Sequence, residues 1–243
     1  MHNLLGIISR KLKQYDKALE YNDLALKYAN KLKDGYYYKL STAGSIASIY
    51  RRKGDYETAI NKYSQILENE NLLAYDSSFY ATTISNRAHS KFLSGIKNKN
   101  DIEKPFREAI EISKAVDNYV TEIYTYFYLS KYFESIKETD SAKKYIDKAY
   151  KISKSYKMND FLLETLVFNA SLKRDSSEFF LKEHIKLNDS LISAERSIRN
   201  KFARINLETD KIQKEKEIVS ETEYSFNCSV VYFSHNLTFI LCC

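Results

Sequence analysis

One sequence pattern occurs four times along the chain and limits the fold more than any other feature. The clearest copies are QYDKALEYNDLAL (14–26) and GDYETAINKYSQIL (54–67), and looser copies are EKPFREAIEIS (103–113) and ETDSAKKYIDKAYKIS (138–153). The first two copies begin 40 residues apart. A repeat of about 20–50 residues is one supersecondary unit, which buries its apolar face only against a neighbouring unit. The chain is therefore predicted to form a solenoid.

The composition favours helices for these units. The 243 residues include only five glycines and one proline, whereas strands and hairpins need these residues at their turns. Hydrophobic residues make up 44% and charged residues 29% of the chain, which excludes wholesale disorder and a polytopic membrane protein. The predicted fold class is all-α: an α-α superhelix followed by a long C-terminal helix.

Small residues mark the places where paired helices are expected to cross. Each copy is predicted to be the second helix of a pair, and the segment before it the first helix. Two antiparallel helices approach closely only where a side chain is small. The first helices supply Gly6, Ala47, Ala88 and Ser130, and the second helices supply Ala18, Ala59, Ala109 and Ala149. A fifth, shortened copy is predicted at residues 161–187.

This order of residues resembles the tetratricopeptide repeat family. The second copy matches most specifically, with Ala47, Tyr50, Gly54, Asp55, Tyr56, Ala59 and Tyr63. The resemblance covers residues 1–187 and implies about four and a half repeats. Ala18 and Ala59 lie 41 residues apart, against about 34 in the standard repeat, so the helices or their loops are expected to be longer. The first helix of the first copy is short, and we expect further repeats upstream of Met1.

Solenoids of this kind present a concave surface made by their first helices. If Leu129 and Ser130 pack inward, then Tyr124, Phe127 and Lys131 lie on the adjacent face of the same helix and line the groove. The corresponding positions of the other first helices are expected to line it as well. The predicted peptide-binding groove consists of Arg51, His89, Tyr124, Phe127, Lys131 and Arg174, with small residues such as Ser48 and Ser85 leaving room at one end. Cations beside rings favour an extended peptide with an acidic group next to an apolar side chain. The alternative is that the rings only complete the packing between repeats and that the basic groups are solvated.

Residues 188–219 are predicted to form a long heptad-like helix. Its aliphatic residues recur at every seventh position: Leu191, Ile198, Ile205, Ile212 and Val219. Of the companion positions only Phe202 is apolar, because the others are Glu195, Thr209 and Lys216. Half of a coiled-coil seam predicts a weak homodimer. The alternative is a stripe that packs on the last repeat or is solvated.

The C-terminal region carries a second resemblance, to the juxtamembrane helix of bacterial membrane-anchored repeat regulators. It rests on Asn-Asp-Ser-Leu (188–191), Lys-Phe-Ala (201–203) and Glu-Thr (208–209). Residues 220–243 follow as a tail that is uncharged from residue 224 onward. This tail is long enough to cross a bilayer of about 30 Å, but polar residues interrupt it, so the transmembrane segment would be weak. The chain is accordingly either cytoplasmic or membrane-associated.

No pattern of residues indicates catalysis. His2, His89, His184 and His235 are isolated from one another, and no Gly-rich phosphate loop or nucleophile elbow occurs. The sequence predicts no catalytic residue, no metal site and no cofactor. The 38 basic and 32 acidic residues are interleaved at a net charge of +6, unlike a nucleic-acid arm, so nucleic acid is an unfavoured partner that would have to stack on tyrosines.

Two functions remain after these exclusions. The predicted function is a non-enzymatic protein- or peptide-binding scaffold. The alternative is the sensor or dimerisation part of a truncated membrane-bound signalling or transcriptional regulator.

Overall fold

The computed structural model describes the backbone of residues 2–240 and the side chains of residues 4–218. Every regular element in this part of the chain is a helix, which confirms the predicted all-α class. The chain divides into two units, Met1–His184 and Ile185–Cys243.

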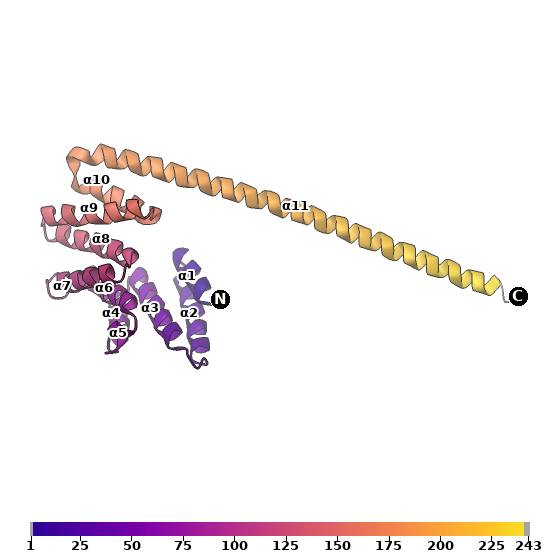
Figure 1. Cartoon of the computed structure of the whole chain (residues 1–243), viewed down its shortest axis with the longest axis horizontal. Coiled ribbons are helices and arrows are strands. Elements are labelled where there is room, and N and C mark those ends of the chain that lie inside the picture. Colours follow the sequence, from indigo (N-terminus) through magenta and orange to yellow (C-terminus); the bar gives the residue numbers. More distant parts are fainter. Residues whose placement is uncertain (1, 241–243) are drawn as a thin grey trace. The chain divides into compact units, whose positions relative to one another are not determined.

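The first unit is a solenoid of consecutive helix pairs (Figure 1). The pairs are α1 (His2–Lys11) with α2 (Tyr15–Ala29), α3 (Tyr36–Lys53) with α4 (Tyr56–Leu67), α6 (Ser77–Leu93) with α7 (Glu103–Ala115), and α8 (Tyr119–Ser135) with α9 (Thr139–Ser155). The single turn α5 (Leu72–Tyr75) lies in the link between α4 and α6.

A shortened fifth pair closes this unit. Helix α10 (Asn159–Leu172) is followed by the 3-10 helix η1 (Arg174–Ser176) and by α11 (Ser177–Ile240). Near the start of α11, Phe180 is buried and its ring meets Tyr150 of α9 edge-on, with 5.8 Å between the centroids. The first two turns of α11 therefore act as the second helix of this pair.

The helix pairs cross where the sequence predicted small residues. All eight of these residues are buried. The Ser130 hydroxyl donates a hydrogen bond of 2.6 Å to the carbonyl of Ala142, from the first helix of the fourth pair to the second. A Cβ atom at Gly6 would meet the side-chain amide of Asn22 on α2. A larger side chain at these positions would force the helices apart.

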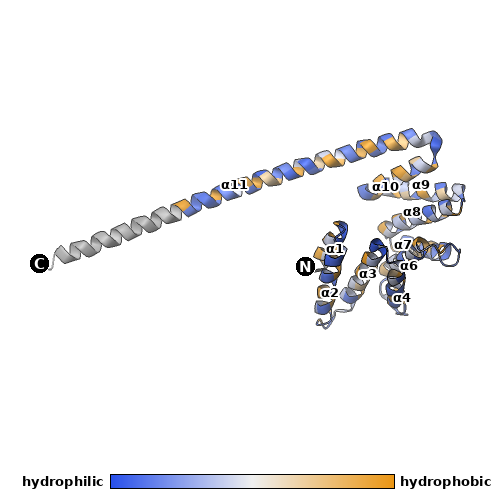
Figure 2. Cartoon of the chain, turned by 180° about the vertical axis from the view of Figure 1, so that it is seen from behind, coloured by the Kyte–Doolittle hydropathy of each residue, from blue (hydrophilic) through white to orange (hydrophobic). Residues whose placement is uncertain are grey.

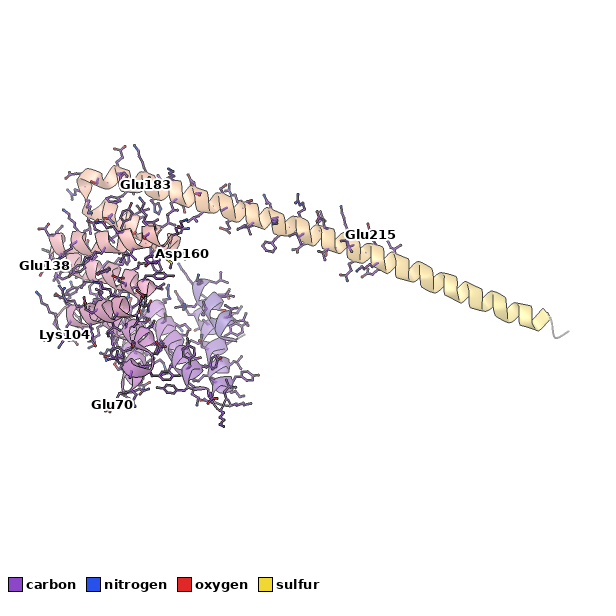
Figure 3. The ribbon with its side chains drawn as sticks, viewed as in Figure 1. Glu70, Lys104, Glu138, Asp160, Glu183 and Glu215 are labelled. Atoms are coloured by element: carbon purple, nitrogen blue, oxygen red, sulfur yellow. The ribbon has the colours of Figure 1, made fainter. Side chains whose placement is uncertain are left out.

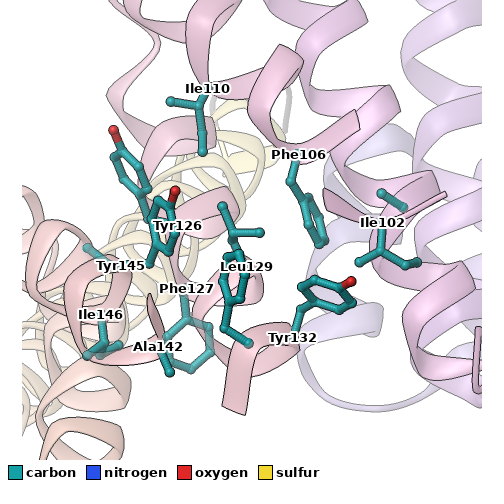
Figure 4. Close-up of a cluster of buried hydrophobic side chains, with 13 residues drawn as sticks. Ile102, Phe106, Ile110, Tyr126, Phe127, Leu129, Tyr132, Ala142, Tyr145 and Ile146 are labelled. Carbon is teal, nitrogen blue, oxygen red and sulfur yellow. The ribbon is translucent and has the colours of Figure 1, made fainter. Parts of the chain in front are cut away.

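The main apolar cluster is built around α8 (Figure 4). Leu129 lies at its centre, with Phe106 and Tyr132 on one side and Tyr126 and Tyr145 on the other. The hydroxyl of Tyr132 donates a hydrogen bond of 3.0 Å to the carbonyl of Lys97, so this buried phenol is satisfied. Nine of the 17 residues of α8 are buried. This helix is consequently covered on most of its circumference.

Six helices of the first unit end in the same type of turn, in which one residue takes a positive φ. These residues are Lys13, Gly54, Gly95, Asp117, Lys137 and Lys157. At Lys137 (φ 65°) its own N–H donates to Glu134 at 3.0 Å, and the next N–H donates to Phe133 at 2.9 Å. This is the Schellman arrangement, which glycine adopts most easily because it has no Cβ.

Replacing Lys137 with glycine is therefore expected to raise the free energy of unfolding by about 1 kcal/mol, because the clash of a Cβ at positive φ disappears. The melting temperature should rise by about 2–4 °C. Thermal unfolding followed by circular dichroism measures this change. The matched control is Lys144→Gly at an exposed site inside α9, which should lower stability by about 0.5–1 kcal/mol. Destabilisation by both variants would contradict the prediction.

In the second unit, α11 continues to Ile240 without a break, as the sequence predicted. Apolar and polar residues alternate along its described part (Figure 2), and side chains such as Glu215 project from it (Figure 3). Within the described residues, no helix is both long and apolar enough to cross a membrane. The side chains of the predicted tail, residues 220–243, lie outside the described residues.

Candidate functional site

Polar contacts join the first helices of the first four pairs, from α1 to α3, from α3 to α6 and from α6 to α8. Their partners are 38 to 40 residues apart in sequence. Thr82 of α6 meets Thr121 of α8 at 2.7 Å, and Ser85 of α6 meets Thr125 of α8 at 2.8 Å. The small polar residues that were expected to leave room in the groove, Ser85 among them, are instead bonded between helices.

An arginine and a histidine lie at the centre of this face. Nη1 of Arg51 on α3 donates a hydrogen bond of 2.7 Å to Nδ1 of His89 on α6. The His89 ring stacks on Tyr128 of α8, with 3.5 Å between the centroids and 18° between the planes. Tyr128 in turn stacks on Tyr124 at 6.1 Å, and Tyr124 meets Phe161 of α10 edge-on at 4.5 Å. The four first helices α3, α6, α8 and α10 thus contribute to one continuous series of side-chain contacts.

The surroundings keep His89 neutral. Burial lowers the pKa of His89 well below its ordinary value, and the positive charges of Arg51, Lys131 and Arg52 lower it further. Arg51 can only donate, so Nδ1 of His89 accepts and its proton resides on Nε2. The arginine therefore fixes both the charge and the tautomer of the histidine.

The cations of this face have no acidic partners. None of Arg10, Arg51, Arg52 and Lys131 forms an ion pair with a carboxylate of the described residues. Nη1 of Arg10 on α1 donates instead to the hydroxyl of Ser48 at 2.7 Å. Burial and the nearby Arg52 lower the pKa of Arg10. This part of the face formed by the first helices is consequently electropositive.

A cavity of about 390 Å³ lies next to these cations, between α8, α10 and the start of α11. Its lining consists of Phe127, Lys131, Leu163, Glu164, Val167, Phe168, Ser171 and His184. The ammonium of Lys131 lies 4.5 Å from the centroid of the Phe127 ring and 5.7 Å from that of Phe168. The cavity therefore combines an apolar wall with one cation, Lys131, and one carboxylate, Glu164.

The six predicted groove residues have different surroundings in the structure. Arg51 and His89 are bonded to each other, and Tyr124 reaches them through Tyr128. Phe127 and Lys131 line the cavity together. However, Phe127 is also 6% exposed and part of the core cluster, so only part of its ring is available.

Arg174 does not continue the face of α10, because that helix ends at Leu172 and Arg174 lies in η1. Three further residues of this face were not among the predicted groove residues: Arg10, Arg52 and Tyr128. Tyr128 lies one helical turn after Tyr124, a spacing that could have identified it.

Comparisons with known proteins identify relatives of the repeat fold. Residues 1–69 match the tetratricopeptide repeat family. No curated protein matches the sequence. Among solved structures, BtubC (BKLC) from P. vanneervenii is similar with a TM-score of 0.60 and 17% identity, over 78% of this chain and 79% of that one.

A second similar structure is that of the putative kinesin light chain of Podosopora anserina, with nearly identical tetratricopeptide-like repeats. Its TM-score is 0.54 and its identity 12%, over 78% of this chain and 94% of that one. At these identities the similarity concerns the fold. It supports the predicted resemblance of residues 1–187 to a tetratricopeptide solenoid.

The neutral state of His89 predicts a pH dependence of stability. Its folded pKa lies below the unfolded value of about 6.5, so its contribution is complete above that pH and is lost as the pH falls below it. The slope can reach about 1.4 kcal/mol per pH unit. Thermal unfolding between pH 7.5 and 5.5 should show a smaller loss for His89→Gln, which keeps an acceptor for Arg51. Equal slopes in the wild type and in His89→Gln would contradict the prediction.

Proposed function

We propose that the protein is a non-enzymatic scaffold that binds an extended peptide along the concave face of its repeats. The observation that carries this proposal is the cavity between α8 and α10, where apolar side chains and Lys131 lie together. Its volume of about 390 Å³ falls within the range of roughly 300–1,000 Å³ typical of ligand pockets. The tetratricopeptide match of residues 1–69 is consistent with a protein-interaction role.

The lining indicates the chemistry of the peptide. Phe127, Val167 and Phe168 offer apolar contact to one aliphatic or aromatic side chain. Lys131 lies at the same cavity and forms no ion pair with a carboxylate of the described residues, Glu164 of the lining included, so it is available for an acidic group beside that side chain. The peptide is therefore expected to carry Asp or Glu next to an apolar residue.

The tyrosines bear on the nucleic-acid alternative, because base stacking requires accessible rings. Tyr63, Tyr126, Tyr132 and Tyr145 are buried in the packing between helices, whereas seven other tyrosines of the described residues, Tyr36 and Tyr75 among them, are exposed. Nucleic acid stays unfavoured because the basic and acidic residues are interleaved along the chain.

Selection from a phage library of random dodecapeptides tests this proposal. The wild-type protein should enrich peptides with an acidic residue beside an apolar one. Val167→Glu, at a position 47% exposed in the cavity, should weaken their binding at least about tenfold, because it brings a charge against the apolar side chain. The matched control is Val116→Glu, 41% exposed outside the cavity, which should bind normally. No enrichment, or equal loss in both variants, would reject the proposal.

A second function, self-association, is favoured by the surface of α11. Ile198, Ile205 and Ile212 recur at seven-residue spacing and are 58%, 44% and 53% exposed, and Phe202 between them is 62% exposed. We infer that a second copy of the chain covers this stripe as a weak homodimer. Such a dimer would suit the sensor part of a membrane-anchored regulator, the function implied by the second resemblance.

Analytical ultracentrifugation over a range of concentrations measures this dimer. Ile205→Asp should shift the chain toward monomer, since it places a charge in the apolar seam. Lys214→Asp, on the same helix outside the stripe, is the control and should leave the equilibrium nearly unchanged. The far-ultraviolet dichroism of the repeats should be the same in both variants. A wild-type chain that is monomeric at every concentration would refute self-association.

A further inference from the structure

The cations around Arg51 form a cluster that the apolar cavity does not explain. Arg10 comes from α1, Arg51 and Arg52 from α3, and Lys131 from α8. Arg10 is close enough to feel the charges of Arg51 and Arg52. His89 feels those of Arg51, Arg52 and Lys131. Unpaired like charges repel and destabilise the fold that brings them together. Such an arrangement indicates a site that is complete only when an anion is present.

A second observation concerns polar atoms buried beside this cluster. Nε of Arg51 and the hydroxyl of Tyr63 are fully buried and make no hydrogen bond of regular geometry with a described residue, although the two side chains lie close enough to act on each other's pKa. A buried polar atom without a partner destabilises the fold. The guanidinium of Arg51 thus retains donor capacity beyond its bond to His89.

The tautomer of His89 adds a further hydrogen-bond donor, the Nε2–H group, to this cluster. Because Nδ1 accepts from Arg51, Nε2 carries the hydrogen. No described residue accepts a hydrogen bond from Nε2 of His89. A neutral imidazole of this kind donates to an oxyanion without taking up a proton. The site therefore offers guanidinium groups, an ammonium group and an imidazole N–H within one electropositive region.

We propose that Arg51, His89, Arg10, Arg52 and Lys131 form an oxyanion-binding site on the concave face. The oxyanion is a carboxylate or phosphate group of the peptide that occupies the groove, since arginine forms charge-assisted pairs with both groups. The site deepens the proposed function by assigning the acidic group of the peptide to α1, α3 and α6. The cavity between α8 and α10 takes the apolar side chain of the same peptide, and Lys131 belongs to both subsites.

The test uses small oxyanion probes, so that it does not depend on the apolar cavity. The probes are inorganic phosphate, a capped triglutamate peptide and a capped Glu-phosphoserine-Glu peptide, all at constant ionic strength. Each probe that binds the folded protein should raise its melting temperature with concentration. Isothermal titration calorimetry then gives the dissociation constants.

Two variants separate the site from general charge attraction. Arg52→Gln changes an exposed side chain and should weaken binding of the favoured probe about tenfold, as expected when one charge-assisted hydrogen bond is lost. Arg196→Gln removes the same charge from an exposed position on α11 and should bind as the wild type does. Arg51→Met should abolish binding, and its far-ultraviolet dichroism shows whether it has folded; Arg52→Gln carries the test if it has not.

The outcomes distinguish a carboxylate ligand from a phosphoryl ligand, and they separate the oxyanion site from the apolar cavity. Tighter binding of triglutamate identifies a carboxylate ligand, and tighter binding of the phosphoserine peptide or phosphate identifies a phosphoryl ligand; either supports the site. Equal binding by wild type and Arg52→Gln, or no binding by wild type, overturns it. Failure of the apolar cavity is seen separately, because the peptide selection tests the cavity with Val167→Glu, whereas the oxyanion titrations test the site with Arg52→Gln.

Discussion

Close crossing of paired helices at small side chains is the constraint on which the rest of this structure depends. Ala47 and Ala59, both fully buried, allow α3 and α4 to approach each other. Repetition of this crossing places successive first helices side by side, close enough for hydrogen bonds between residues 38 to 40 positions apart. The concave face and its cations are a product of this spacing, because no single helix carries more than two of them.

The fold could be read from the sequence because its determinants are local and recur. The alanines at the crossings and the glycine of the second copy, Gly54 with a φ of 91°, are recognisable from their spacing alone. The long helix α11 was likewise predictable, since its segment has no glycine or proline. The positive φ of Lys137 and Lys157 could not be read from residue type. There the hydrogen bonds of the turn impose a conformation that lysine does not favour.

The candidate site was predictable only in part, because an offset along one helix assumes that the helix has one inner face. Helix α8 violates this assumption, and Phe127 is buried although its position was predicted to face the groove. Arg10 and Arg52 could not be found by the same rule, since long side chains reach the groove from positions beside its face. Arg174 was predicted to continue the face of α10, but that helix ends at Leu172 without a glycine or proline to signal it. Lys173 is extended there, with φ −120° and ψ 78°.

Cations lie beside tyrosine rings on both the first and the second helices, but Lys114 and Arg51 differ in whether they also pair with a carboxylate. On the second helices, Lys114 lies 5.9 Å from the ring of Tyr126 and also 4.0 Å from the carboxylate of Glu111. On the first helices, Arg51 lies 5.9 Å from the ring of Tyr128, but its hydrogen bond goes to a neutral histidine. A cation that only stabilised the fold would be as well served by a carboxylate as Lys114 is. The absence of one beside Arg51, among the described residues, leaves its charge available to an anion from outside the chain.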